Sequence, residues 1–161
     1  MTVQPMERDH MQPRFKITAD PAAYPAMSEL EKYVHQTSLE VPLIHIVKLY
    51  ASIINHCAYC IDMHWKDLRA LGETEQRLYG LPAWREAPYY TDRERAAFVW
   101  TEAVTVMTDG FISDEAYEAV KEHFSEKEIA ELTMVLVAIN GWNRLSVAAR
   151  ATAGTYQPKK Q

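Results

Sequence analysis

The 161-residue sequence predicts an all-α protein, and three observations support this class. Apolar residues recur at steps of three and four along most of the chain, as they do on amphipathic helices. Thr91-x-x-Glu94 and Ser125-x-x-Glu128 have the capping-box pattern that begins helices. No two alternating segments could pair as strands, and there is no tandem repeat. The length fits one domain with a substantial core.

The first half of the chain predicts three longer helices and one short helix. Asp20-Pro21 is a start signal, because aspartate caps helix N-termini and proline fits the first turn. The helix after the second start is apolar on more than one side, so we expect it at the centre of the fold. The third helix begins near Cys57 and ends at Gly72. The expected ranges are 21–35, 42–54, 57–71 and 73–79, and the preceding residues 14–17 alternate in a way that permits a short strand.

The second half predicts a loop followed by three helices. Residues 81–90 contain two prolines and three aromatic side chains, and they are predicted to form the loop. The helix capped by Thr91 continues to Met107 and is broken at Gly110. Ser113 caps the next helix, whose expected inward-facing residues are Tyr117, Val120 and Phe124.

The last predicted helix, which ends near Ala149, has the densest apolar stretch and should lie in the core. Trp142, Asn143 and Arg144 interrupt its apolar face. Two interpretations are open: these residues end the helix at the surface, or they pack near the cysteines.

Composition and charge exclude several classes of protein. The net charge is −5 without a long basic run, which argues against a nucleic-acid partner. The apolar run at 134–139 is far shorter than the roughly 20 residues that cross a membrane. The first residues are polar and lack a signal core, so we expect a cytoplasmic protein. We divide the chain into a flexible lead-in (1–13), one helical domain (14–155) and a polar tail (156–161).

Cys57 and Cys60 are the two cysteines of the chain, and His64 follows four residues later. On a helix these three residues would share one face, and His56 would lie close to the same face. Two thiols at this spacing can cycle between dithiol and disulfide. A nearby imidazole can lower the pKa of a thiol until the reactive thiolate is populated at neutral pH. In a reducing compartment such a pair is more often catalytic or metal-binding than a structural bridge.

Two other interpretations of the cysteine pair remain open. Free cysteine is commonly buried as a small apolar residue, and these two could simply be core residues. Cysteines and histidines also bind metals, although a structural zinc site normally has four ligands in closed spacing and this chain has one Cys-x-x-Cys.

The Cys-x-x-Cys-x-x-x-His pattern after an apolar helix resembles the core of AhpD-like alkylhydroperoxidases in the carboxymuconolactone decarboxylase family. The resemblance covers roughly residues 14–150. It extends over the phrases LEKYVHQTSLE, IINHCAYCIDMH, LGETEQRLYGLPAWRE, YTDRERAAFVWTEAVT and FSEKEIAELTMVLVAINGWNRL. It implies an AhpD-like all-helical domain that assembles into a homo-oligomer, a trimer or hexamer, with active sites near the subunit contacts.

The resemblance also implies a peroxidase cycle for alkyl hydroperoxides. One thiolate becomes a sulfenic acid, the other condenses with it to a disulfide, and a dithiol or lipoyl-type donor reduces that disulfide. When the family pattern is transferred to this chain, it implies that Cys60 attacks the peroxide, Cys57 resolves the sulfenic acid and His64 belongs to a proton relay. The helix dipole alone would instead favour Cys57 as the reactive thiolate. The resemblance implies no cofactor other than the redox-active disulfide, and it implies no resident metal.

One position departs from the family pattern. Relatives usually carry the relay glutamate twelve residues before the first cysteine, where this chain has His45, although Lys48 matches. Imidazole accepts protons differently from a carboxylate, so we expect altered or weak peroxidase activity. Tyr50 also differs from the usual residue. We place Tyr50, His56 and Trp142 around the catalytic set His45, Cys57, Cys60 and His64.

Two alternative functions follow from these residues. His45, Cys57, Cys60 and His64 could form a two-thiolate, two-imidazole set that suits zinc, which would make the chain a non-catalytic metal-binding protein. Alternatively, the chain could be a decarboxylase like the enzymes that give the family its name. Those enzymes do not depend on a redox cysteine pair, so its presence argues against this alternative.

Overall fold

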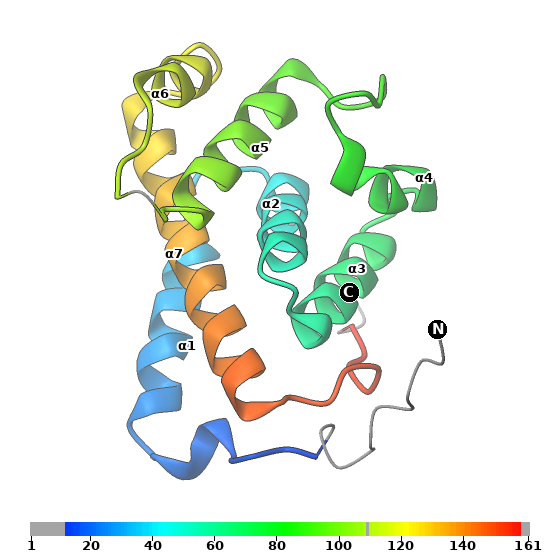
Figure 1. The fold of residues 1–161 in the computed structure, drawn as a ribbon, viewed down its shortest axis with the longest axis vertical. Coiled ribbons are helices and arrows are strands. Elements are labelled where there is room, and N and C mark those ends of the chain that lie inside the picture. The colour runs from blue at the N-terminus through cyan, green and yellow to red at the C-terminus, as the bar shows by residue number, and fades with distance from the viewer. Residues whose placement is uncertain (1–11, 109, 159–161) are drawn as a thin grey trace, which may run out of the picture.

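The computed structural model describes residues 12–108 and 110–158, and this part of the chain is helical without a strand. Helix α2 lies at the centre, between α3, α5 and α7, and α1 packs along α7 (Figure 1). The elements are η2 (Ile17–Ala19), α1 (Ala23–Val34), α2 (Val41–Ile54), α3 (Ala58–Ala70), α4 (Glu75–Tyr79), η3 (Leu81–Ala83), α5 (Asp92–Thr105), α6 (Asp114–Lys121) and α7 (Glu126–Ala149). The predicted all-α class is confirmed.

The central position of α2 follows from its sequence. Every residue from Leu43 to Ser52 is buried except His45. Each fully buried aliphatic side chain of this kind contributes about 1.5–3 kcal/mol through the hydrophobic effect. The exception is informative, because a break in an otherwise buried run points to a hollow beside the helix. That hollow is the cavity described below.

The predicted helix starts are confirmed at three caps. The capping boxes of Thr91 with Glu94 and of Ser125 with Glu128 are both complete. The Ser113 side chain accepts a hydrogen bond from the Ala116 backbone at the start of α6. Short polar side chains thus satisfy backbone N–H groups that the first helical turn leaves without partners.

Some predicted boundaries are wrong. The short strand that the sequence permitted at residues 14–17 does not form, since Arg14 makes one backbone bond to the end of α7 and has no strand beside it. Helix α1 begins later than predicted, because Asp20 Oδ1 accepts from the Ala22 amide in a turn. Helix α5 ends at Thr105, before Gly110 is reached.

One prediction about side chains needs correction, and one of the two open interpretations of residues 142–144 is excluded. Tyr117 is 40% exposed instead of facing inward, whereas Val120 and Phe124 are buried as predicted. Trp142, Asn143 and Arg144 do not end the last helix, which continues to Ala149.

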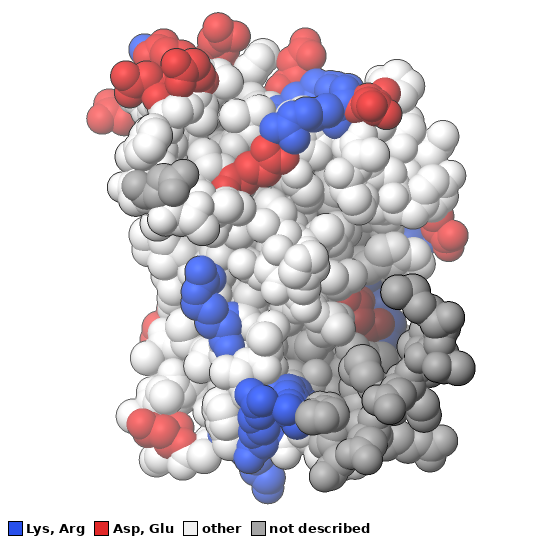
Figure 2. Space-filling model, viewed as in Figure 1, with Lys and Arg blue, Asp and Glu red and all other residues white. Residues whose placement is uncertain are grey.

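Charged side chains gather toward one end of the molecule, around α6 and the start of α5, and few lie over the middle of the face shown in Figure 2. Among the described residues 12–108 and 110–158, no helix combines the length and the apolar composition needed to cross a membrane.

Candidate active site

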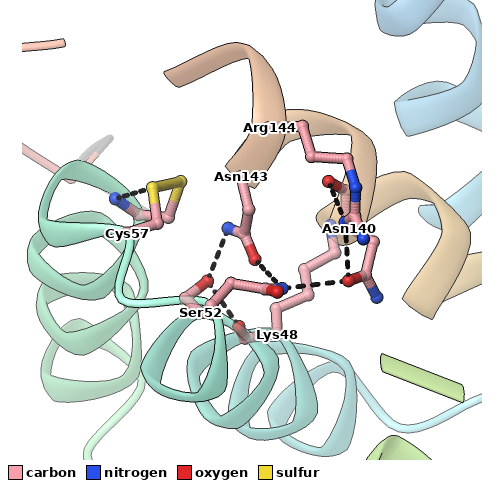
Figure 3. Close-up of a disulfide and its surroundings, with 8 residues drawn as sticks. Lys48, Ser52, Cys57, Asn140, Asn143 and Arg144 are labelled. Carbon is pink, nitrogen blue, oxygen red and sulfur yellow. Dashed lines mark hydrogen bonds between the residues drawn. A yellow bond between two sulfur atoms is a disulfide. The ribbon is translucent and has the colours of Figure 1, made fainter. Parts of the chain in front are cut away.

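The cysteine pair lies at the start of α3. Asn55 ends α2 and His56 adopts a left-handed conformation with φ 54°, which turns the chain into the next helix. The helix begins near Cys57 as predicted, but Cys57 is its N-cap and lies outside the helix, and its sulfur accepts a hydrogen bond from the Cys60 amide at 3.4 Å. The two cysteines form a disulfide with their Cα atoms 5.4 Å apart, and both are buried (Figure 3). In the reduced state, the N-terminal end of the helix dipole would stabilise a thiolate here.

A polar network on α7 holds the turn that carries the cysteines. Asn143 donates to Ser52 Oγ at 3.0 Å and accepts from Asn55 Nδ2 at 2.9 Å (Figure 3). Asn55 also donates to Asn140 at 2.9 Å. Asn143 is itself buried, so these bonds satisfy its amide away from water. Asn143 therefore packs near the cysteines, which is one of the two interpretations of residues 142–144.

A cavity of about 660 Å³ lies beside the disulfide. Residues of α1, α2, α3 and α7 line it together with the segment that follows α7. Cys60 lines this cavity, whereas Cys57 does not. A small molecule in the cavity would thus meet Cys60 first. The walls are mostly apolar and aromatic, with a few convergent polar groups, as is usual for small-molecule sites.

The polar groups on one side of the cavity are His45, His64 and Asp67. The Nδ1 atoms of the two histidines lie 3.4 Å apart. Oδ2 of Asp67 lies 3.8 Å from Nδ1 of His45 and 4.0 Å from Nδ1 of His64. The Tyr156 hydroxyl donates to Oδ1 of Asp67 at 2.7 Å. The pairing of His45 with His64 joins α2 to α3, which their distance in the sequence does not reveal.

Burial makes both imidazoles weak bases. It lowers the pKa of His64 well below its usual value, and the nearby Lys48 and His45 lower it further. Burial also lowers the pKa of His45, with the Asp67 carboxylate acting in the opposite direction. Both rings are therefore neutral near pH 7. A neutral imidazole has one nitrogen that donates and one that accepts, so a proton can pass through the pair.

A second polar cluster lies on the α1 side of the cavity. The buried Lys48 donates to the Glu31 carboxylate, and Trp142 Nε1 donates to the other carboxylate oxygen at 3.2 Å. Glu31 and Trp142 both line the cavity. A carboxylate thus reaches the cavity even though position 45 carries a histidine, and its partner Lys48 neutralises it.

Not every predicted site residue lies at the cavity. His56 is exposed and precedes α3, so it does not share the helical face of Cys60 and His64 as predicted. The Tyr50 hydroxyl donates to Glu102 and accepts from Trp84, and Tyr50 does not line the cavity. Trp142 lies at the cavity as predicted.

The alternative four-residue metal set of His45, Cys57, Cys60 and His64 would require both thiols to be free. The two sulfurs are joined in the disulfide, and the close group of ligand atoms found in the described residues is His45, His64 and Asp67.

Sequence reasoning missed Asp67, Glu31 and Tyr156. Asp67 follows His64 by three residues, which places both on one helical face, and that spacing could have revealed it. Glu31 and Tyr156 come from distant segments, and nothing in the sequence connects either residue with the cysteines.

The comparisons with known proteins agree with this architecture. A model of the carboxymuconolactone decarboxylase family matches residues 21–103. The uncharacterized Bacillus subtilis protein YdfG is 40% identical over 128 residues, which are 80% of this chain and 87% of YdfG.

Among solved structures, Agrobacterium tumefaciens ATU0492 is 42% identical with a TM-score of 0.86, covering 90% of this chain and all of that one. It is described as a protein of unknown function with a suggested role in AhpD-type antioxidant defence. An uncharacterized peroxidase-related protein with an AhpD core from Ralstonia eutropha has a TM-score of 0.76. It is 16% identical, and the likeness covers 86% of this chain and 74% of that one, so it shows a shared fold alone.

Proposed function

Because the chain belongs to the carboxymuconolactone decarboxylase family, we propose that it is an AhpD-like thiol peroxidase that reduces alkyl hydroperoxides with Cys57 and Cys60. One observation carries the proposal: the cysteine pair closes a disulfide at the start of α3, and Cys60 lines an apolar cavity. The proposed substrate is a small organic hydroperoxide, and the proposed reductant is a dithiol or lipoyl-type donor.

The first step is attack by the Cys60 thiolate on the terminal oxygen of the hydroperoxide. The O–O bond breaks, Cys60 becomes a sulfenic acid, and the departing alkoxide takes a proton to become an alcohol. The thiol proton of Cys60 passes to the neutral His64 one helical turn away, and the His64–His45 pair can return it to the alkoxide.

The second step closes the disulfide. The Cys57 thiolate attacks the sulfenic sulfur of Cys60, and the hydroxyl group leaves as water after taking one proton. The position of Cys57 at the N-cap of α3 supports this role, since the helix dipole stabilises its thiolate. An external dithiol then reduces the disulfide by exchange and is itself oxidised, which restores both thiols.

The experiment is a count of free thiols before and after one equivalent of tert-butyl hydroperoxide, followed by a dithiol reductant. We expect the reduced protein to lose two thiols and to regain both. Cys60→Ser should abolish peroxide consumption. Cys57→Ser should stop the cycle at a sulfenic acid on Cys60 that dimedone traps. Peroxide turnover that survives in both serine variants would refute the proposal.

A decarboxylase-like reaction is the second candidate, and it rests on the family match together with His45, His64 and Asp67 at the cavity. These groups could act on a carboxylate substrate without the thiols. Decarboxylation of a lactone acid that persists after both thiols are alkylated would favour this candidate over the peroxidase.

A further inference from the structure

We propose that His45, His64 and Asp67 bind a divalent transition-metal ion at the wall of the cavity, with zinc as the representative ion. His45 comes from α2, while His64 and Asp67 come from consecutive turns of α3. One ligand atom from each residue lies within 4.8 Å of the other two. All three residues line the cavity.

The separation of the two imidazoles fits a shared ion. Two ligands that each lie about 2.0–2.1 Å from a tetrahedral zinc ion are roughly 3.4 Å apart. The two Nδ1 atoms are 3.4 Å apart. As a direct hydrogen bond this distance is long, since N–H donors usually lie about 2.9–3.0 Å from their acceptors. The spacing of the two nitrogens therefore also fits two ligands of one metal ion.

The carboxylate completes the set with a small movement. Asp67 Oδ2 lies 3.8 and 4.0 Å from the two nitrogens, so a shift of roughly half an ångström would bring it to the spacing of a tetrahedral site. The Tyr156 hydroxyl already holds the other oxygen of this carboxylate. Such outer hydrogen bonds orient metal ligands and strengthen metal binding.

The charges around the three ligands are compatible with a cation. Lys48 is the basic side chain whose charge acts on both histidines, and it is paired with Glu31. The carboxylate of Asp67 supplies a negative charge directly to the ion. The pairing of Lys48 thus reduces the repulsion that a buried lysine would otherwise cause.

Two imidazoles and one carboxylate leave one position of a tetrahedral ion without a protein ligand, and all three ligands line the cavity. Zinc sites with three protein ligands and one open position are typical of catalysis, whereas structural sites have four protein ligands. The same donor set also suits iron(II). The cysteines are not part of this set, so binding does not require free thiols and does not depend on the proposed peroxidase function.

The test uses the full-length protein, treated with a chelator and oxidised so that the disulfide is closed. Zinc binding is measured by calorimetry, and cobalt(II) is added as a spectroscopic probe of the ligand geometry. We expect one ion per chain. His45→Ala and Asp67→Asn should each weaken binding at least tenfold, and Tyr156→Phe should weaken it about tenfold, as loss of an outer hydrogen bond does at other sites.

The controls separate this site from other sources of binding. His35→Ala changes another histidine at the cavity, one that contacts Glu31, and should leave the affinity unchanged. The double variant Cys57→Ser, Cys60→Ser should bind as the parent does. Because His64 is buried, the more exposed His45 and Asp67 provide the decisive variants, and circular dichroism must show that each variant is folded.

Three results would overturn the proposal. These are absence of saturable binding to the oxidised protein, unchanged affinity in folded His45→Ala and Asp67→Asn, and binding that appears only when the thiols are free. The last result would place the metal on the cysteines. If the parent protein binds the metal but does not reduce peroxide, the proposed peroxidase function is refuted and the metal site is not.

Discussion

Burial gives several polar side chains around the cavity properties that they lack in water. His64 is held neutral, and Lys48 is paired with Glu31 inside the fold. Asn143 is bonded on both sides of its amide. Each of these groups depends on a partner from another helix. Substituting one of these side chains therefore also leaves its partner on the other helix without a hydrogen bond or a compensating charge.

Replacing Asn143 with alanine should destabilise the protein. Ser52 and Asn55 would each lose a hydrogen-bond partner, and an unsatisfied buried group costs about 1–3 kcal/mol. We expect the free energy of unfolding in urea to fall by about that amount. Arg144→Ala, at the exposed neighbouring position, is the control and should have a much smaller effect. Equal effects of the two substitutions would show that the network does not stabilise the turn.

At the scale of the helices, α3 carries the largest part of the site, and α7 holds the turn that precedes it. Cys57 caps α3, so the residues after it lie on successive turns, and Cys60, His64 and Asp67 all reach the cavity. Helix α7 begins at the Ser125–Glu128 capping box, and Arg93 of α5 donates to Glu128 at 2.6 Å. The start of α7 is thus fixed to α5 by one carboxylate.

This carboxylate should make stability depend on acid pH. Hydrogen bonds from the Ser125 backbone and from Arg93 lower the pKa of Glu128 from 4.5 to about 2. A lowered pKa in the folded state means that the stabilisation is complete above pH 4.5 and is lost as the pH falls from 4.5 toward 2. We expect Glu128→Gln to be less stable at pH 7 and to lose less stability than the parent between pH 5 and pH 2.

Unfolding in urea at several pH values measures this difference. Glu126→Gln, in the same first turn, is the matched control. It should reproduce the pH profile of the parent. If the free energy of unfolding of Glu128→Gln depends on pH in the same way as that of the parent, the acid dependence does not come from Glu128.

The whole molecule leaves apolar side chains exposed away from the cavity. Val106, Met107 and Val137 are each about half exposed and line a second hollow, between the end of α5 and α7. Contiguous exposed apolar surface is typical of an interaction site. Together with the family resemblance, this surface leads us to expect a homo-oligomer, a trimer or hexamer.

Val137→Asp should weaken that assembly, because it would bury a charge against a second copy. Light scattering coupled to size-exclusion chromatography, over a range of concentrations, measures the mass. Glu118→Lys, on the exposed surface of α6, is the control and should leave the mass unchanged. A parent protein that remains monomeric at every concentration would contradict the expected homo-oligomer.

The sequence by itself determined the fold class, most of the helix starts and the position of the cysteine pair near the start of a helix. These features depend on local chemistry. Caps such as Ser113 and Ser125 satisfy backbone groups within three residues, and the apolar period of α2 alone placed that helix at the centre. The site residues Cys60 and His64 were also predictable, because helical spacing relates them. Boundaries such as the end of α5 were less predictable, because tertiary contacts compete with weak local signals.

Only the tertiary structure decided which polar groups meet at the cavity. It placed Glu31, Asp67 and Tyr156 there, although the sequence had not singled them out, and it separated Tyr50 and His56 from the site. The physical reason is that buried charges and imidazoles take their properties from partners that lie nearby in space. The pairs Lys48–Glu31 and His45–His64 join different helices, and Tyr156 reaches Asp67 from the segment after α7. Such contacts form only when the helices pack, so no local pattern encodes them.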